Sequence, residues 1–107
     1  GESSDKIRPR VILARNIQKD RFEKAGNIYC NSQMSSKDIA NYCMLNSNGQ
    51  TLLKLAMEKL NLSARAYDRI IKVSRTIADL GASHDIKNDH LAEAIQYRSL
   101  DRDNWGS

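Results

Sequence analysis

Residues 62–80 read LSARAYDRIIKVSRTIADL, the clearest helical pattern in the sequence. Ser63 is a favoured N-cap residue and Gly81 follows the last apolar position, so we predict a helix over residues 64–80. At 100° per residue, one face of this helix collects six side chains within about 120°. They are Tyr67, Ile70, Ile71, Ser74, Ile77 and Ala78. This face is predicted to pack in the core.

The opposite face of the same helix is cationic. One stripe at helical spacing is made of Arg65, Arg69, Lys72, Thr76 and Asp79. Arg65 lies in the first turn, where a cation opposes the helix dipole, so it does not stabilise its own helix. A guanidinium at this position can bind a phosphate through paired hydrogen bonds. The alternative from spacing alone is an ordinary solvated face, partly balanced by Asp68.

Four further helices are predicted from the periodicity of the remaining sequence. Ser35 and Asp38 form a capping-box pattern at the start of one of them, and Asn88 is a candidate N-cap for the last. Pro9 fits only the first turn of a helix, so the first helix is predicted to begin near Arg8. The predicted spans are residues 8–24 with Gly26 as a stop, 35–42, 50–60 and 89–97.

The predicted fold class is all-α. No run alternates apolar and polar residues as a half-buried strand would, and Leu91, Ala94 and Ile95 give the last helix an inward face. We therefore expect a small bundle of about five helices. One domain should span residues 1–107, with residues 101–107 as a flexible polar tail.

The composition is typical of a soluble globular domain. The 107 residues include 17 Lys and Arg and 13 Asp and Glu, which gives a formal net charge of +4, and 40% of the residues are hydrophobic. This balance excludes a disordered chain, a collagen-like repeat and a disulfide scaffold. No stretch approaches the roughly 20 apolar residues of a membrane span. Two cysteines are too few for a secreted framework, so we expect a cytoplasmic protein with no membrane partner.

Motifs of several enzyme classes are absent from these residues. The sequence has no G-x-x-x-x-G-K-[ST] phosphate loop, no nucleophile elbow and no H-E-x-x-H or C-x-x-C pair. Zinc could in principle use Cys30, Cys43, His84 and His90. Structural zinc sites gather their ligands in close pairs, whereas here the two cysteines are far apart in sequence. We therefore expect no metal site, and no enzymatic activity from this chain alone.

Two parts of the sequence closely resemble one protein family. They are LSARAYDRI at residues 62–70, continued by RTIADL at 75–80, and HLAEAIQYR at 90–98. Both are similar to the C-terminal domain of Mg chelatase-like AAA+ ATPases of the bacterial competence type. Residues 1–11 also resemble the start of that domain, so the resemblance covers almost the whole chain. Pro9 and the loop at residues 81–85 depart from the family pattern.

The resemblance implies a helical lid that packs over the nucleotide of a ring-forming ATPase. The implied partners are an upstream P-loop core of the same protein, neighbouring subunits of a ring, and DNA, with ATP and Mg²⁺ as cofactors of the whole protein. Arg65 matches the family's sensor-2 arginine, which approaches the ATP phosphates. Arg69 and Lys72 are supporting candidates, and Arg75 is expected at the surface or an interface. Whether Arg65 acts on its own subunit's nucleotide or a neighbour's stays open.

A second hypothesis is a stand-alone helical module that binds DNA or protein. Residues 86–95 loosely resemble the last part of a histone-like fold, and three cations one turn apart could follow a nucleic-acid backbone. No aromatic side chain interleaves with the cationic stripe, however, so a stacking surface for single strands is not evident. A metal-binding domain is the third alternative.

Overall fold

The computed structural model describes residues 4–23 and 28–100, and the side chains of residues 8–23 and 28–97 among them. Its elements in chain order are α1 (Ser4–Phe22), the 3₁₀ turn η1 (Asn31–Gln33), α2 (Ser36–Tyr42), α3 (Ser47–Leu60), α4 (Ala64–Leu80) and α5 (Asn88–Leu100). No strand occurs in the ranges that the model describes. The predicted all-α bundle is confirmed. The expected tail at residues 101–107 and the stop at Gly26 lie outside the described residues.

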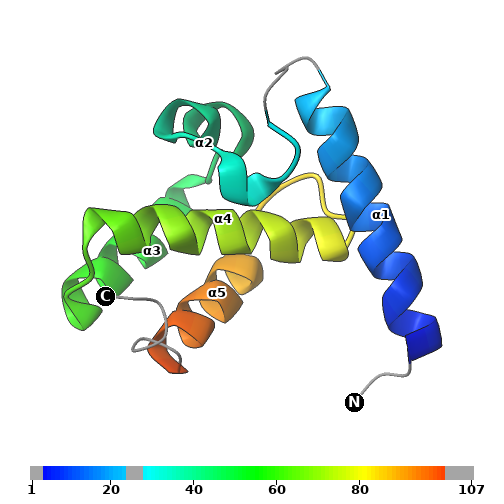
Figure 1. Cartoon of the computed structure of the whole chain (residues 1–107). Helices are drawn as coiled ribbons and strands as arrows, with labels where there is room; N and C mark the ends of the chain where they lie inside the picture. The colour runs from blue at the N-terminus through cyan, green and yellow to red at the C-terminus, as the bar shows by residue number, and fades with distance from the viewer. Residues whose placement is uncertain (1–3, 24–27, 101–107) are drawn as a thin grey trace.

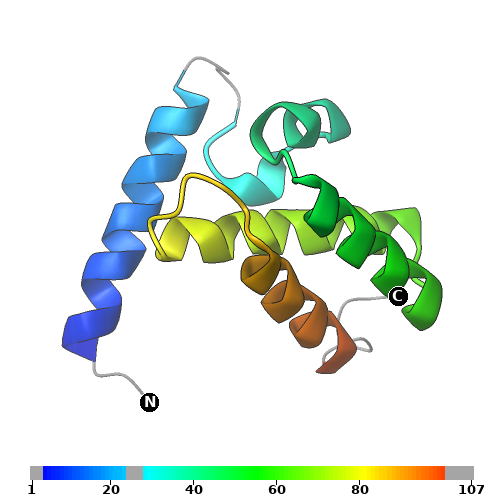
Figure 2. The same ribbon diagram turned by 180° about the vertical axis from the view of Figure 1, so that it is seen from behind.

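Helix α4 is the central element of the bundle. Figures 1 and 2 show α1 crossing the C-terminal end of α4, η1 and α2 along one of its sides, and α3 and α5 along another. Among these elements, α4 packs against α1, η1, α2 and α5, while α3 packs mainly against α5. The helix predicted from residues 62–80 is therefore the one around which the others assemble.

The apolar face of α4 packs in the core as predicted. Ile70 and Ala78 are fully buried, and Ile71 is 2% exposed. Ser74 is also fully buried, and its hydroxyl donates to the carbonyls of Ile70 and Ile71 at 2.7 and 2.9 Å, so this buried polar group is satisfied. Leu53 from α3 and Leu91 from α5 belong to the same cluster of buried residues: Phe22, Ile28, Met34, Ile39, Cys43, Leu53, Ile70, Ile71, Ala78, Ile86, Leu91 and Ala94.

Tyr67 was predicted on the core face but is 39% exposed. It lies in the first turn of α4, beside an open groove between α2, α3 and α4, so no helix covers it fully. At the C-terminal end of α4, more of the helix circumference is buried than predicted. There α1 packs across the helix and covers Asp79, which was predicted to face solvent. The exposed face of one helix thus changes along its length because its covering elements change.

Local capping sets the start of α2 and α4. The Ser35 side chain and the Asp38 side chain each bond the other's backbone N–H, which makes the predicted capping box. The Ser63 hydroxyl accepts from the Ala66 N–H at 3.2 Å, and α4 spans residues 64–80 as predicted. These two predictions from sequence are confirmed.

Several predicted helix boundaries differ from the structure. Helix α1 begins at Ser4, ahead of the predicted Arg8, and Pro9 lies inside it, where the missing N–H removes one intrahelical bond. Helix α3 begins at Ser47 because the Asn46 side chain accepts from the Gly49 N–H at 2.7 Å. Helix α5 already includes Asn88, which was predicted as its cap, and it continues to Leu100, past the predicted end at residue 97.

None of the helices in the described part of the chain has the length and apolar character needed to cross a membrane.

Ala82, which follows the C-terminal end of α4, has a left-handed backbone conformation. Gly81 has φ −90°, whereas Ala82 has φ +54°. The Ser83 N–H donates to the Ala78 carbonyl at 2.8 Å and the Ala82 N–H to the Asp79 carbonyl at 3.0 Å. This is the Schellman pattern, in which the left-handed position normally belongs to glycine. Gly81 therefore lies one residue before Ala82, the position whose positive φ would favour glycine.

Replacing Ala82→Gly should raise the free energy of unfolding by about 1 kcal/mol, because glycine adopts a positive φ without steric cost. Urea unfolding followed by circular dichroism measures this change. Gly81→Ala is the matched control: a Cβ there would meet the carbonyls of Ile77 and Ala78 at an ordinary 3.7 Å, so its midpoint should not fall appreciably. A less stable Ala82→Gly variant would contradict the assignment of strain to this position.

Candidate functional site

A hollow of about 660 Å³ lies between α4 and η1. It is lined by Ser32 from η1 and by seven residues of α4: Arg65, Asp68, Arg69, Lys72, Val73, Thr76 and Ile77. The structure therefore brings the three cations predicted as site residues to one concave surface. Arg65 is exposed, while Arg69 and Lys72 are half-buried.

The second wall of this cationic hollow is η1, which the sequence analysis did not identify. The Lys72 ammonium donates to the Ser32 carbonyl at 3.3 Å. The Ser32 hydroxyl also lies 3.1 Å from the Cys30 thiol. Residues 30 and 32 precede Lys72 by about forty positions, so no local spacing in the sequence could reveal this contact.

The electrostatics of the cationic hollow favour an anion. Three cationic side chains line it against the single carboxylate of Asp68. Arg65 lies in the first turn of α4, whose N-terminal N–H groups add positive potential. Val73 and Ile77 supply apolar surface beside these charges. The hollow thus presents both positive charge and apolar surface.

A buried charge cluster lies behind the cationic hollow. The carboxylate of Asp79 is fully buried and accepts from both terminal nitrogens of Arg21 on α1, at 2.9 and 2.6 Å. The Nδ2 of Asn31 also donates to it at 2.9 Å. Asp79 was predicted to continue the exposed stripe, and that prediction is wrong because α1 covers this end of α4.

Arg75 was predicted at the surface or an interface but is only 5% exposed. Its terminal nitrogens donate to the carbonyls of Ser83 and His84 at 2.8 and 3.0 Å, which ties the loop after α4 to the helix. Its Nε lies 3.3 Å from an Asp79 oxygen, within ion-pair distance but without hydrogen-bond geometry. Burial lowers the pKa of Arg75 and the charge of Asp79 opposes this shift.

The sequence did contain one clue to this cluster. Arg75 and Asp79 are four residues apart and flank the apolar Ile77 and Ala78, so a charged pair inside a core-facing segment was visible. Their partner Arg21 is 58 positions from Asp79, and no pattern in the sequence connects the two.

The four candidate zinc ligands do not gather in the structure. Cys43 is buried and Cys30 half-buried, whereas the His84 ring is 99% exposed. The Nδ1 of His90 accepts from the Lys87 N–H at 2.9 Å at the start of α5. Within the described ranges, no three His, Cys, Asp or Glu side chains are grouped so that they could hold a metal ion.

Replacing Asp79→Asn should lower the free energy of unfolding by about 3 kcal/mol or more, because Arg21 and Arg75 would keep their buried charges without a counter-ion. Urea unfolding monitored by circular dichroism is the measurement. Asp85→Asn is the control, since that carboxylate is 82% exposed and its loss should leave the midpoint nearly unchanged. Equal stability of the two variants would show that the buried cluster does not hold the bundle together.

Cys43 should make stability depend on pH in the alkaline range. Burial raises the pKa of its thiol from 9.0 to about 11. Between these values the unfolded chain loses the proton while the folded chain keeps it, so stability falls by about 1 kcal/mol per pH unit. The difference in unfolding free energy between the native chain and Cys43→Ala should therefore change from pH 8 to pH 11. Cys30→Ala serves as the comparison, and parallel profiles for all three would refute the shift.

Comparison with known proteins identifies the family. Residues 1–98 match the family described as magnesium chelatase, subunit ChlI C-terminal. The chain is 47% identical over 102 residues to competence protein ComM of Haemophilus influenzae and 40% identical to protein YifB of Escherichia coli. Each alignment covers 95% of this chain but only 19% of the relative. The chain thus spans about a fifth of the length of these relatives, and it belongs to the magnesium chelatase ChlI C-terminal family.

Proposed function

We propose that this chain is the lid domain of a Mg chelatase-like AAA+ ATPase and that Arg65 is its nucleotide-sensing, sensor-2 residue. The observation that carries this proposal is the convergence of Arg65, Arg69 and Lys72 on one hollow. A stripe of cations on a convex helix face would be an ordinary solvated surface. Cations grouped around a concave surface of 660 Å³ have space for a bound anion between them.

Arg65 carries the principal role in this proposal. Its side chain is exposed at the start of α4 and makes no hydrogen bond or ion pair to the other described residues. A planar guanidinium in this state can bind two phosphate oxygens at once and loses no internal partner when it does so. Arg69 and Lys72 lie deeper along the same helix and add positive charge beneath it.

ATP and Mg²⁺ belong to the whole protein in this proposal. The cationic hollow fits the phosphates, because its lining supplies three positive charges. It does not offer the carboxylate ligands of a magnesium site, since Asp68 is its only acidic residue. The P-loop and the metal ligands would come from an upstream core. This chain would neutralise phosphate charge and would not hydrolyse ATP by itself.

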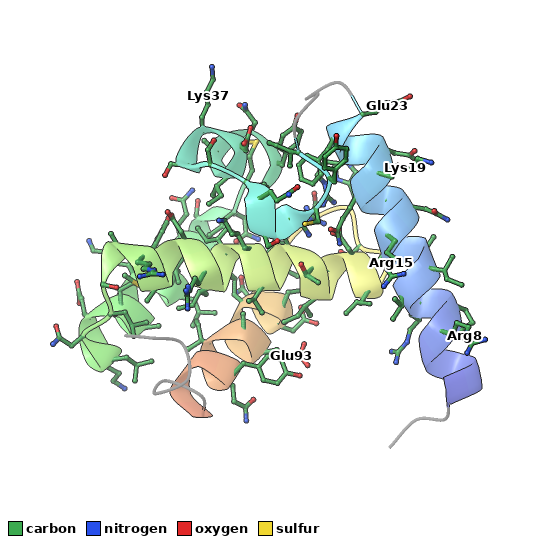
Figure 3. All side chains as sticks on the ribbon, viewed as in Figure 1. Arg8, Arg15, Lys19, Glu23, Lys37 and Glu93 are labelled. Carbon is green, nitrogen blue, oxygen red and sulfur yellow. The ribbon has the colours of Figure 1, made fainter. Side chains whose placement is uncertain are left out.

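Contact with that core is assigned to α1. Figures 1 and 2 show the N-terminal half of α1 extending beyond the other helices, and Figure 3 shows Arg8, Arg15 and Lys19 distributed along the helix. Ile12 and Leu13 lie on this part of α1 and are 51% and 44% exposed. The relatives are about five times longer than this chain, so further protein is available to cover these side chains.

Action on DNA, in a ring-shaped motor of the bacterial cytoplasm, completes the proposal. Of these parts, only a link to competence is supported, by the name of the Haemophilus influenzae relative. DNA binding by the lid itself is the competing function. Titration of this chain with duplex and single-stranded DNA separates the two. Submicromolar binding that weakens steeply with salt would favour a DNA-binding module, and its absence would favour the lid.

In the full-length protein, Arg65→Ala should lower ATP turnover by about 100-fold, because a preorganised cation on the transferred phosphate is lost. Arg65→Lys keeps the charge but not the paired hydrogen bonds and should recover only part of the rate. Steady-state phosphate release measures turnover, and circular dichroism verifies the fold. Lys37→Ala is the control, since Lys37 is an exposed cation on α2 that does not line the hollow. Full turnover in Arg65→Ala would refute the sensor role.

A further inference from the structure

We propose that Asn31 is a positioning residue for the cationic hollow and that α1 controls the affinity of the hollow for phosphate through it. This inference rests on the proposed function of the hollow. It concerns residues that do not themselves line it. Among the side chains that the structure describes, none that lines the hollow comes from α1, so an influence of α1 on a bound phosphate would pass through another element.

Asn31 is fixed between α1 and α4 by its hydrogen bonds. It is 2% exposed, and its backbone N–H donates to the Gln18 Oε1 at 3.1 Å. Its side-chain oxygen accepts from Arg21 at 2.8 Å. Its Nδ2 donates to Thr76 Oγ1 at 3.0 Å and to Asp79 Oδ2 at 2.9 Å. Both side-chain polar atoms are satisfied, so Asn31 cannot rotate without leaving a buried group unpaired.

The next residue, Ser32, transmits this position to the cationic hollow. Its carbonyl accepts from the Lys72 ammonium at 3.3 Å, and Ser32 itself forms part of the wall. A phosphate bound near Lys72 must share that ammonium with the carbonyl. Displacement of η1 would therefore move both the Ser32 wall of the hollow and the position that the Lys72 ammonium prefers. Asn31 holds η1 in the place where Lys72 faces the hollow.

The connection works in both directions. If α1 alters phosphate affinity through Gln18 and Asn31, then phosphate binding must alter the energetics of α1 by the same factor. Helix α1 carries the exposed residues that the proposed function assigns to the upstream core. A lid built in this way would report the occupancy of its cationic hollow to the remainder of the protein through α1, which does not itself line the hollow.

Gln18→Met tests the inference because it removes one hydrogen bond to η1 without touching the hollow. Isothermal titration of this chain with inorganic tripolyphosphate should show about five-fold weaker binding for Gln18→Met, the loss expected from one hydrogen bond of about 1 kcal/mol. Asn16→Met, on an exposed position of the same helix, is the matched control and should bind as the native chain does.

A double-mutant cycle with Lys72→Ala distinguishes positioning from general loosening of the fold. If Gln18 acts through Ser32 and Lys72, Gln18→Met should have no further effect on affinity once Lys72 is alanine. Fully additive effects would overturn the inference, as would equal affinity of Gln18→Met and the native chain. If the native chain itself does not bind tripolyphosphate, the proposed function of the hollow fails first and the inference falls with it.

Discussion

The carboxylate of Asp79 is the constraint on which the arrangement of the bundle depends. A fully buried negative charge is tolerated only when partners replace its lost hydration. Here Arg21 supplies two hydrogen bonds, Asn31 supplies another, and Arg75 lies within ion-pair distance. These partners come from α1, η1 and α4, so a single carboxylate fixes the relative positions of three elements. The apolar core alone would allow these elements to slide, because hydrophobic burial is non-directional.

The same cluster explains why α4 has charged side chains both around the open hollow and in the buried interior. Toward its N-terminal end the stripe faces the open hollow, which Arg65, Arg69 and Lys72 line. One to two turns later α1 covers the stripe, and the Asp79 side chain belongs to a buried hydrogen-bond network. The hollow and the network share η1 as their common wall and meet at Asn31 and Ser32. The hollow that we propose to bind phosphate is thereby attached to a buried hydrogen-bond network, and preorganised electrostatic binding requires such a support.

Membership in the magnesium chelatase ChlI C-terminal family gives these features a context. The chain corresponds to about a fifth of relatives such as competence protein ComM, so its open surfaces need not be open in a longer protein. The cationic hollow, the exposed apolar residues of α1 and the groove beside Tyr67 are all candidates for contact with the remaining four fifths.

The sequence by itself determined the class of the fold, the span of α4, the caps at Ser35 and Ser63, and the face on which Arg65, Arg69 and Lys72 gather. All of these follow from interactions within a few residues, which periodicity and capping preferences describe well. Tertiary structure alone decided that Asp79 and Arg75 are buried, that Tyr67 is exposed, and that Ser32 forms the second wall of the cationic hollow. Burial of a charge depends on which distant element covers it and supplies its counter-ion. Here Arg21 supplies the counter-ion and Asn31 a further hydrogen bond, across 58 and 48 positions of sequence, a separation over which no local pattern carries information.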